Sequence, residues 1–427
     1  MKRRLLVSLL IVSVAAMSFG CGKREIPKDE IVETSDDPFD GMDELVPEKN
    51  AKITIMTSCV DFVTEMGERF KEKYKDYNIE IKVENKGLGL VDKLSVDGPA
   101  GTGADVIIAA HDEFIEGMNA ELFLEISPKL SGDIIKAENE VGINSVTYDD
   151  KLYGVPVSLE TSCMFYNKDI VGDKPAETFE EIAEKSLEYN DYTNNNFYFL
   201  VKIGDGYKLF PFMSAFGYRP FGEKGIDKDP GFSSDEYLKG LEAVAKLKDM
   251  INMKASDLNS DSYLSTLFKD GKLAYMFTGP WDVATFDSAG INYGVTTLPT
   301  YNGKAMTPFA GVMNAHVSAY TKFPRTAELF VSTLCTDEAA SVLYEKENKI
   351  TTLKDISNVS GINEDERIAC FVKQFSDSVP MPSIAEVTYY WPITESISKL
   401  VFDKELTPEE GQKKSIENYK TLTESNK

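Results

Sequence analysis

Hydrophobic and polar positions alternate along residues 51–57, which is typical of a β-strand with one buried face. Apolar side chains then recur at helical spacing and would form one face of an amphipathic helix: Val63, Met66, Phe70 and Tyr74. Alternation returns along residues 79–84. A strand, a helix and a second strand in immediate succession predict a β-α-β unit with parallel strands. The pattern therefore favours the α/β class.

The same two periods continue to the end of the chain. Short apolar runs predict further strands at 104–110, 152–157, 163–166, 273–277 and 293–298. Helical spacing predicts amphipathic helices over 238–251, 327–334 and 393–401. One hydrophobic core rarely organises a chain of 427 residues, so the length predicts two lobes.

The N-terminal segment differs from the rest of the chain. Basic residues 2–4 precede a short apolar run, which is the pattern of a secretory signal peptide. The sequence from Ser18 to Cys21 then resembles a lipoprotein cleavage site, so we expect residues 1–20 to be removed and Cys21 to carry a lipid. An ordinary secretory signal with an incidental cysteine is the alternative. Residues 21–50 are polar and acidic, and they predict a flexible linker to the membrane anchor.

Charge and residue counts exclude several classes of partner. The formal net charge is −24, so the chain lacks the basic surface that nucleic-acid phosphates need. The two histidines, His111 and His316, are predicted to be structural, and no GxSxG or HExxH motif occurs. We expect no cofactor and no bound metal. Four cysteines beyond Cys21 lie far apart without a CxxC pair and predict buried thiols in preference to disulfides: Cys59, Cys163, Cys335 and Cys370.

The most specific chemistry lies between residues 269 and 299. A predicted strand ends at Gly279-Pro280, and Trp281 follows at the mouth of a sheet, where α/β proteins hold their ligands. The segments FKDGKLAYMFTGPW (268–281) and INYGVTTLPT (291–300) resemble the maltose/maltodextrin-binding proteins of ABC importers. Further matching segments extend the resemblance from Ala51 to the C-terminus: ADVIIAAHDEF (104–114), LYGVPVSLETSCMFYNKDI (152–170), 178–182, 308–312, 334–340 and 379–392.

This resemblance to bacterial solute-binding protein family 1 implies an α/β, two-lobed periplasmic-binding-protein-like fold, with three hinge crossovers and a ligand cleft between the lobes. The N-terminal lobe would contain residues 51–158 and 300–335, and the C-terminal lobe residues 159–299 and 336–427. The resemblance also implies a monomer that delivers an oligosaccharide to the permease subunits of an ABC transporter. The lipid would hold it on the outer face of the cytoplasmic membrane, or on the periplasmic side in a Gram-negative cell.

A sugar has apolar faces and a rim of hydroxyls, so its site needs flat rings for stacking and fixed carboxylates for hydrogen bonds. The resemblance implies such hydrogen-bonding roles for Asp112, Glu160, Asp205 and, more loosely, Asp61. It implies stacking roles for Tyr207, Trp281, Tyr390 and Trp391, and it leaves open which of the last two faces the cleft.

Four of these candidates also have a structural alternative. Asp112 would serve equally as a helix N-cap, and Glu160 as a solvated loop charge. Asp205 lies in a GDG sequence that is ordinary turn chemistry, and Trp281 would serve as a core aromatic.

The sequence departs from the family pattern near the first strands. Ala109 and Glu113 stand where a tryptophan and an arginine are expected, and Ser58 and Asp61 are only loose counterparts of an Asp-Lys pair. These departures favour longer α-glucans or another oligosaccharide over maltose. Two other classes stay open from the residues alone, a glycosidase with two carboxylates and a surface lipoprotein that binds a protein. We expect a binding protein without enzymatic activity.

Overall fold

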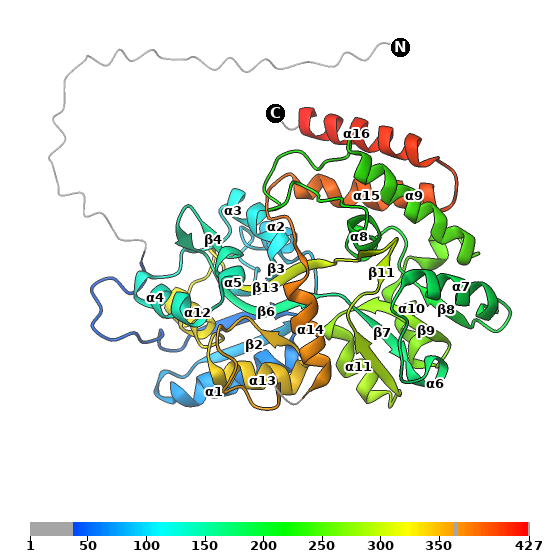
Figure 1. Ribbon diagram of the computed structural model, residues 1–427. Coiled ribbons are helices and arrows are strands. Elements are labelled where there is room, and N and C mark those ends of the chain that lie inside the picture. The colour runs from blue at the N-terminus through cyan, green and yellow to red at the C-terminus, as the bar shows by residue number, and fades with distance from the viewer. Residues whose placement is uncertain (1–36, 363–364, 426–427) are drawn as a thin grey trace, which may run out of the picture. The chain divides into compact units, whose positions relative to one another are not determined.

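The computed structural model describes residues 37–362 and 365–425 (Figure 1). The predicted signal peptide, Cys21 and the first part of the predicted linker lie outside the described residues. No helix in the described part of the chain is both long and apolar enough to cross a membrane.

A large sheet of seven strands organises the N-terminal lobe. Its order is β14-β6-β13-β3-β1-β2, with β15 paired to β13. The strands β1 (Lys52–Thr57), β2 (Glu80–Asn85) and β3 (Val106–Ala110) are parallel, and α1 (Val60–Lys73) connects the first two. The predicted β-α-β unit is therefore confirmed. The remaining strands are β6 (Val155–Thr161), β13 (Phe309–Val317), β14 (Ile350–Thr351) and β15 (Val379–Pro380).

A smaller sheet of four strands organises the C-terminal lobe. Its order is β10-β7-β9-β8, and β7 (Cys163–Asn167) runs antiparallel to both of its neighbours. Its other strands are β8 (Phe197–Leu200), β9 (Leu273–Thr278) and β10 (Tyr293–Thr296). The strands β7 and β9 are buried along their whole length, as expected for strands covered by helices on both faces.

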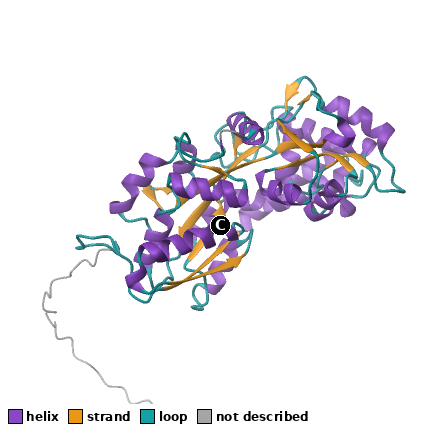
Figure 2. Cartoon of the chain, turned by 90° about the horizontal axis from the view of Figure 1, so that it is seen from below, coloured by secondary structure: helices purple, strands orange, loops and turns teal. Residues whose placement is uncertain are grey.

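Helices surround both sheets, as the purple coils around the orange strands show (Figure 2). The large sheet is accompanied by α2 (Leu90–Asp97), α3 (Phe114–Asn119), α4 (Pro128–Ala137), α5 (Glu140–Asn144), α12 (Pro324–Ser332) and α13 (Asp337–Glu347). The smaller sheet is accompanied by α6 (Lys168–Val171), α7 (Phe179–Tyr189), α8 (Gly206–Ser214), α9 (Asp235–Met250), α10 (Asp261–Lys269) and α11 (Val283–Ser288). The chain ends with α14 (Glu366–Ser376), α15 (Val387–Phe402) and α16 (Pro408–Ser425).

The chain passes between the two lobes at three places, and one of them lies between β15, which pairs with β13, and α15, which packs on α9. Ser162 alone separates β6 from β7, and residues 297–308 lead from β10 to β13. A third passage was also predicted near residues 336–338, but the chain does not leave the large sheet there. There α13 packs against α1, and β14 pairs with β6, so this stretch stays with the large sheet. The reason is a stripe of small and aliphatic side chains on α13 that suits the surface of α1: Ala339, Ala340, Val342 and Leu343.

Residues 37–50 also differ from the expected flexible linker. Phe39 is fully buried in the core of the N-terminal lobe, and Lys129 Nζ donates hydrogen bonds to the carbonyls of Phe39 (2.8 Å) and Met42 (2.7 Å). Glu48 accepts hydrogen bonds from the backbone N–H groups of Arg325 and Thr326. Burial of Phe39 and the contact of Glu48 with the N-terminus of α12 hold this acidic segment against the lobe.

The cysteines and histidines have structural environments. Cys59, Cys163 and Cys335 are buried and Cys370 is half-buried, all as free thiols. His111 Nδ1 accepts from the Val312 N–H (3.0 Å), so its Nε2–H donates to the Met381 carbonyl (3.1 Å). His316 is stacked on Phe123 with ring centroids 4.3 Å apart, and burial lowers its pKa to about 4. In the described residues no group of three His, Cys, Asp or Glu side chains is arranged to hold a metal ion.

Candidate functional site

The candidate site begins with a hydrogen bond that joins the two lobes. Asp112 follows β3 in a single 3-10 turn (His111–Glu113), and its Oδ2 accepts from the Trp391 Nε1–H of α15 at 3.1 Å. Burial raises the pKa of Asp112 to about 6, although the Trp391 hydrogen bond opposes the shift. A carboxylate with a raised pKa at the end of a parallel strand is typical of a functional site.

Four aromatic rings continue from this contact, and we call them the ring row: Trp391, Phe309, Tyr207 and Trp281. Adjacent ring centroids are separated by 6.0 Å, 5.9 Å and 6.5 Å in that order. The rings come from α15, β13, α8 and the turn after β9, so segments from both lobes contribute. Trp281, Tyr207 and Asp112, which the sequence places far apart, therefore lie in one connected region.

Glu160 forms a buried ion pair beside the ring row. Its Oε1 accepts hydrogen bonds from Lys349 Nζ and from Ser158 Oγ, both at 2.7 Å. β14 pairs antiparallel with β6, with Ile350 opposite Leu159, and this register places Lys349 next to Glu160. Burial raises the pKa of the Tyr207 phenol, and the negative charge of nearby Glu160 raises it further. The next residue, Thr161, donates its hydroxyl to the Phe309 carbonyl at 3.0 Å, so the ion pair lies next to the ring row.

Hydroxyl groups in this region lack hydrogen-bond partners. The buried hydroxyls of Tyr207 and Ser162 face each other, and neither has a partner at full hydrogen-bond geometry among the described residues. A buried hydroxyl without a partner costs about 1–3 kcal/mol, so most proteins avoid it away from functional sites. A guest with several hydroxyls would supply the missing partners. The region combines apolar rings, carboxylates and unmet hydroxyls, as a carbohydrate site requires.

Two further predicted acids have contacts within their own elements. Asp205 is the N-cap of α8, where it accepts from the N–H groups of Tyr207 (3.0 Å) and Lys208 (3.1 Å), and it also pairs with Lys202. Asp205 therefore orients the helix that carries Tyr207. Asp61 is exposed in the first turn of α1, where its charge complements the helix N-terminus.

Tyr390 and Trp391 are neighbours in sequence with different surroundings. Tyr390 is fully buried and stacked on Phe232, with ring centroids 5.8 Å apart and planes inclined by 9°. Trp391 is half-buried and reaches Asp112 and Phe309. The structure therefore places Trp391 in the candidate site and Tyr390, also expected there as an alternative, in the core of the C-terminal lobe.

Three residues of this region were not among the sequence predictions. Phe309 joins the ring row, Lys349 pairs with Glu160, and Lys208 is buried with its Nζ 4.8 Å from the Trp281 ring centroid. The segment PFAGV, which carries the family resemblance, was a signal for Phe309. Lys349 and Lys208 had no such signal, because each is defined by a partner distant in sequence.

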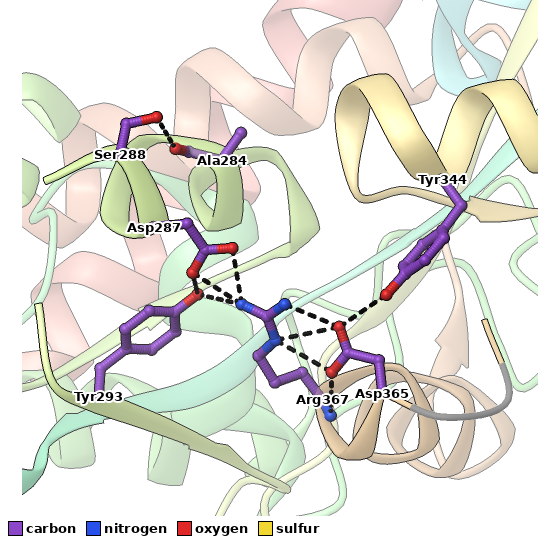
Figure 3. A network of polar contacts seen from close by, with 7 residues as sticks. All are labelled: Ala284, Asp287, Ser288, Tyr293, Tyr344, Asp365 and Arg367. Atoms are coloured by element: carbon purple, nitrogen blue, oxygen red, sulfur yellow. Dashed lines mark hydrogen bonds and ion pairs between the residues drawn. The ribbon is translucent and has the colours of Figure 1, made fainter. Parts of the chain in front are cut away.

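A second polar cluster lies elsewhere, and we call it the Arg367 cluster (Figure 3): Asp287, Tyr293, Tyr344, Asp365 and Arg367. Arg367 Nη1 donates to both oxygens of Asp287, at 2.8 and 2.9 Å, and Nη2 donates to Asp365 at 2.7 Å. Tyr344 donates its hydroxyl to Asp365 at 3.0 Å, and Tyr293 donates to Asp287 at 2.7 Å. These residues help to line a polar groove of about 740 Å³. Their polar groups already bond to one another.

Two α/β lobes that bring aromatic rings from both lobes together beside two carboxylates of the large-sheet lobe define a two-lobed binding protein. The chain belongs to the family described as bacterial extracellular solute-binding protein, whose model matches residues 65–369. This membership confirms the predicted resemblance and supports a binding role over an enzymatic one.

Curated relatives share this family. A galactooligosaccharide-binding protein of Bacillus subtilis (strain 168) is 30% identical over 356 residues, which cover 81% of this chain and 83% of the relative. A maltodextrin-binding protein of the same strain is 28% identical over 360 residues, or 82% and 84% of the two chains. A maltooligosaccharide ABC transporter solute-binding lipoprotein of Streptococcus pneumoniae is 27% identical over 409 residues, or 93% and 89%.

Solved structures confirm the predicted fold. The crystal structure of a cyclo/maltodextrin-binding protein complexed with maltotetraose superposes with a TM-score of 0.72 at 27% identity, covering 88% of this chain and 97% of that one. The maltotriose-binding protein of Thermus thermophilus, bound with maltotriose, superposes with a TM-score of 0.77 at 22% identity, covering 87% and 100%.

Proposed function

We propose that this chain is the lipid-anchored, extracytoplasmic carbohydrate-binding subunit of an ABC importer. It binds maltodextrin-type or related oligosaccharides and delivers them to the transmembrane permease subunits as a monomer. The observation that carries the proposal is the ring row beside Asp112 and Glu160, with buried hydroxyls that lack partners. Relatives named for maltodextrin, maltooligosaccharide and galactooligosaccharide binding support it.

In the proposed site, Trp281, Tyr207 and Trp391 stack on the sugar faces, while Asp112 and Glu160 accept hydrogen bonds from sugar hydroxyls. Tyr390, Asp205 and Asp61 act outside the ligand contacts, through packing and helix capping. The sugar bridges both lobes, so it favours the arrangement in which the lobes approach each other. A ligand without contacts to both lobes would not shift that equilibrium.

Galacto-oligosaccharides are the second candidate ligand. The Bacillus subtilis relative with 30% identity is named for them, and Ala109 replaces the tryptophan expected in maltodextrin-binding relatives. Loss of that ring removes one stacking surface for a glucose unit, which favours a differently shaped chain.

Calorimetric titration of the mature protein with maltotriose, maltotetraose, galactotriose and galactotetraose tests the ligand class. We expect at least one oligosaccharide to bind with a Kd near or below about 1 μM, which corresponds to about −8 kcal/mol. The sugar should be recovered intact after incubation, since no hydrolysis is proposed. Absence of heat with every sugar would contradict the proposal, and a cleaved sugar would support the enzyme alternative.

The anchor has its own test. Cells that express the full chain should carry it in the membrane fraction with covalently attached fatty acid, and Cys21→Ser should release the protein in unlipidated form. A wild-type protein that is secreted without lipid would contradict the anchor and leave the ligand proposal intact.

A further inference from the structure

The pair formed by Lys349 and Glu160 is unusual because both side chains are nearly inaccessible to solvent. Lys349 is 6% exposed and Glu160 is 8% exposed, and their Nζ–Oε1 distance is 2.7 Å. Removing either charge would leave the other buried without a counter-ion, which proteins rarely tolerate. Replacing such a pair with apolar residues is often neutral or stabilising, so stability alone is a weak reason for the pair.

The distribution of hydrogen bonds on Glu160 indicates what the pair does. Both Lys349 and Ser158 donate to Oε1, and in the part of the chain that the structure describes no group donates to Oε2. The Glu160 charge also acts on the Tyr207 phenol of the ring row, whose buried hydroxyl lacks a partner at full hydrogen-bond geometry. One carboxylate oxygen of Glu160 is thus held by two donors, while the other has no donor among the described residues.

The surroundings of Lys349 keep it charged. Burial alone would lower its pKa, but the negative charge of Glu160 and the neighbouring Glu347 carboxylate outweigh burial and raise the pKa. Lys349 therefore stays positively charged, and its ammonium group lies next to the Oε1 atom of Glu160.

We propose that Lys349 is a positioning residue for ligand binding, which fixes the orientation of the Glu160 carboxylate through Oε1 and leaves Oε2 to accept from a hydroxyl of the bound oligosaccharide. The inference rests on the proposed function, because it concerns the same site. Lys349 itself need not contact the sugar. It acts through Glu160, so its contribution disappears when Glu160 can no longer accept as an anion.

A double-mutant cycle tests this coupling. The Kd for the tightest-binding sugar of the calorimetric panel is measured for the wild type, Lys349→Met, Glu160→Gln and the double variant. We expect each single variant to weaken binding about thirtyfold or more, the usual range for breaking a buried charge pair. The Kd of the double variant should lie within about twofold of the Kd of whichever single variant binds less tightly.

Conservative and matched variants separate positioning from loss of structure. Lys349→Arg should recover most of the affinity, because it restores a cation that donates hydrogen bonds. Lys52→Met, which breaks an exposed pair with Glu80 in the same lobe, should leave the Kd unchanged. If Lys349→Met does not fold, Lys349→Gln takes its place in the cycle, since it keeps a donor without the charge.

The outcomes are distinguishable. A folded Lys349→Met or Lys349→Gln with wild-type Kd would overturn the inference, and so would additive losses in the double variant. A wild type that binds none of the four sugars would overturn the proposed function, and the inference with it. Coupled losses with rescue by arginine would support the positioning role.

Discussion

Two polar clusters of this protein join chain segments that are far apart in sequence, and they differ in how completely they are satisfied. In the Arg367 cluster, two carboxylates, two tyrosine hydroxyls and one guanidinium bond to one another (Figure 3). Beside the ring row, Glu160 has an unused oxygen, and the hydroxyls of Tyr207 and Ser162 have no partner. The first arrangement is what a structural cluster needs. The second leaves hydrogen-bonding capacity for a guest.

We expect the largest effect from a substitution that removes a ring from the ring row. Trp281→Ala should weaken sugar binding about a hundredfold, because a stacking aromatic at the centre of a site typically contributes about 2–4 kcal/mol. Calorimetry measures the Kd, with Trp281→Phe as the matched control that retains a ring and should lose less. An unchanged Kd for the alanine variant would remove Trp281 from the site.

A substitution in the Arg367 cluster should lower stability and leave sugar affinity nearly unchanged. Arg367→Met leaves the largely buried Asp365 carboxylate without its counter-ion and should lower the free energy of unfolding by about 2 kcal/mol, while the Kd stays within about twofold. Urea denaturation and calorimetry measure the two quantities. Lys404→Met is the matched control, because it breaks an exposed pair with Asp249 and should change stability by less than about 0.5 kcal/mol. A large loss of affinity in Arg367→Met would mean that this cluster belongs to the binding mechanism.

The acidity of Asp112 predicts a pH dependence of affinity. Its pKa is about 6, so lowering the pH from 8 to 5 protonates the carboxylate and removes an acceptor for a sugar hydroxyl. The Kd should rise about tenfold over this range, since each pH unit below the pKa corresponds to about 1.4 kcal/mol. Asp112→Asn should bind more weakly at pH 8 and show a flat profile. A wild-type Kd that is independent of pH would contradict the role of Asp112.

The stability of the sugar-free protein should respond to the same group with the opposite sign. The folded pKa of Asp112 is raised above its ordinary value of 3.8, so its contribution to stability is fully present below that value and is lost as the pH rises through about 6. Burial also raises the pKa of Glu138 and of Glu328 to about 7, and these act in the same direction. The difference between the wild type and Asp112→Asn isolates the contribution of Asp112.

We expect the smallest effects from substitutions of the two adjacent aromatic residues Tyr390 and Trp391. Trp391→Phe removes the Nε1–H that donates to Asp112 and should weaken sugar binding about fivefold, or about 1 kcal/mol, the net value of a typical hydrogen bond. Tyr390→Phe removes a buried hydroxyl that faces Tyr218 without full hydrogen-bond geometry, so both the Kd and the melting temperature should stay near wild type. A loss of affinity in Tyr390→Phe without one in Trp391→Phe would place Tyr390, and not Trp391, in the binding site.

The sequence by itself determined the local elements and much of the fold class. Period-two and period-3.6 patterns predicted the β-α-β unit at the N-terminal lobe, and Thr178 caps α7 as its TFEE sequence indicates, accepting from the Glu181 N–H. These features depend on residues a few positions apart. The length predicted two lobes, and the family resemblance then added the cleft between them and most of the candidate ligand contacts.

Only the tertiary structure decided which polar groups meet. Lys349 and Glu160 are 189 positions apart, and the register of β14 on β6 brings them together. Tyr390 and Trp391 are consecutive, yet successive helix positions point about 100° apart, and the packing of α15 on α9 buries one of them while the other reaches Asp112. Local periodicity sets the direction of each side chain relative to its own element. The neighbour that it meets depends on how whole elements pack.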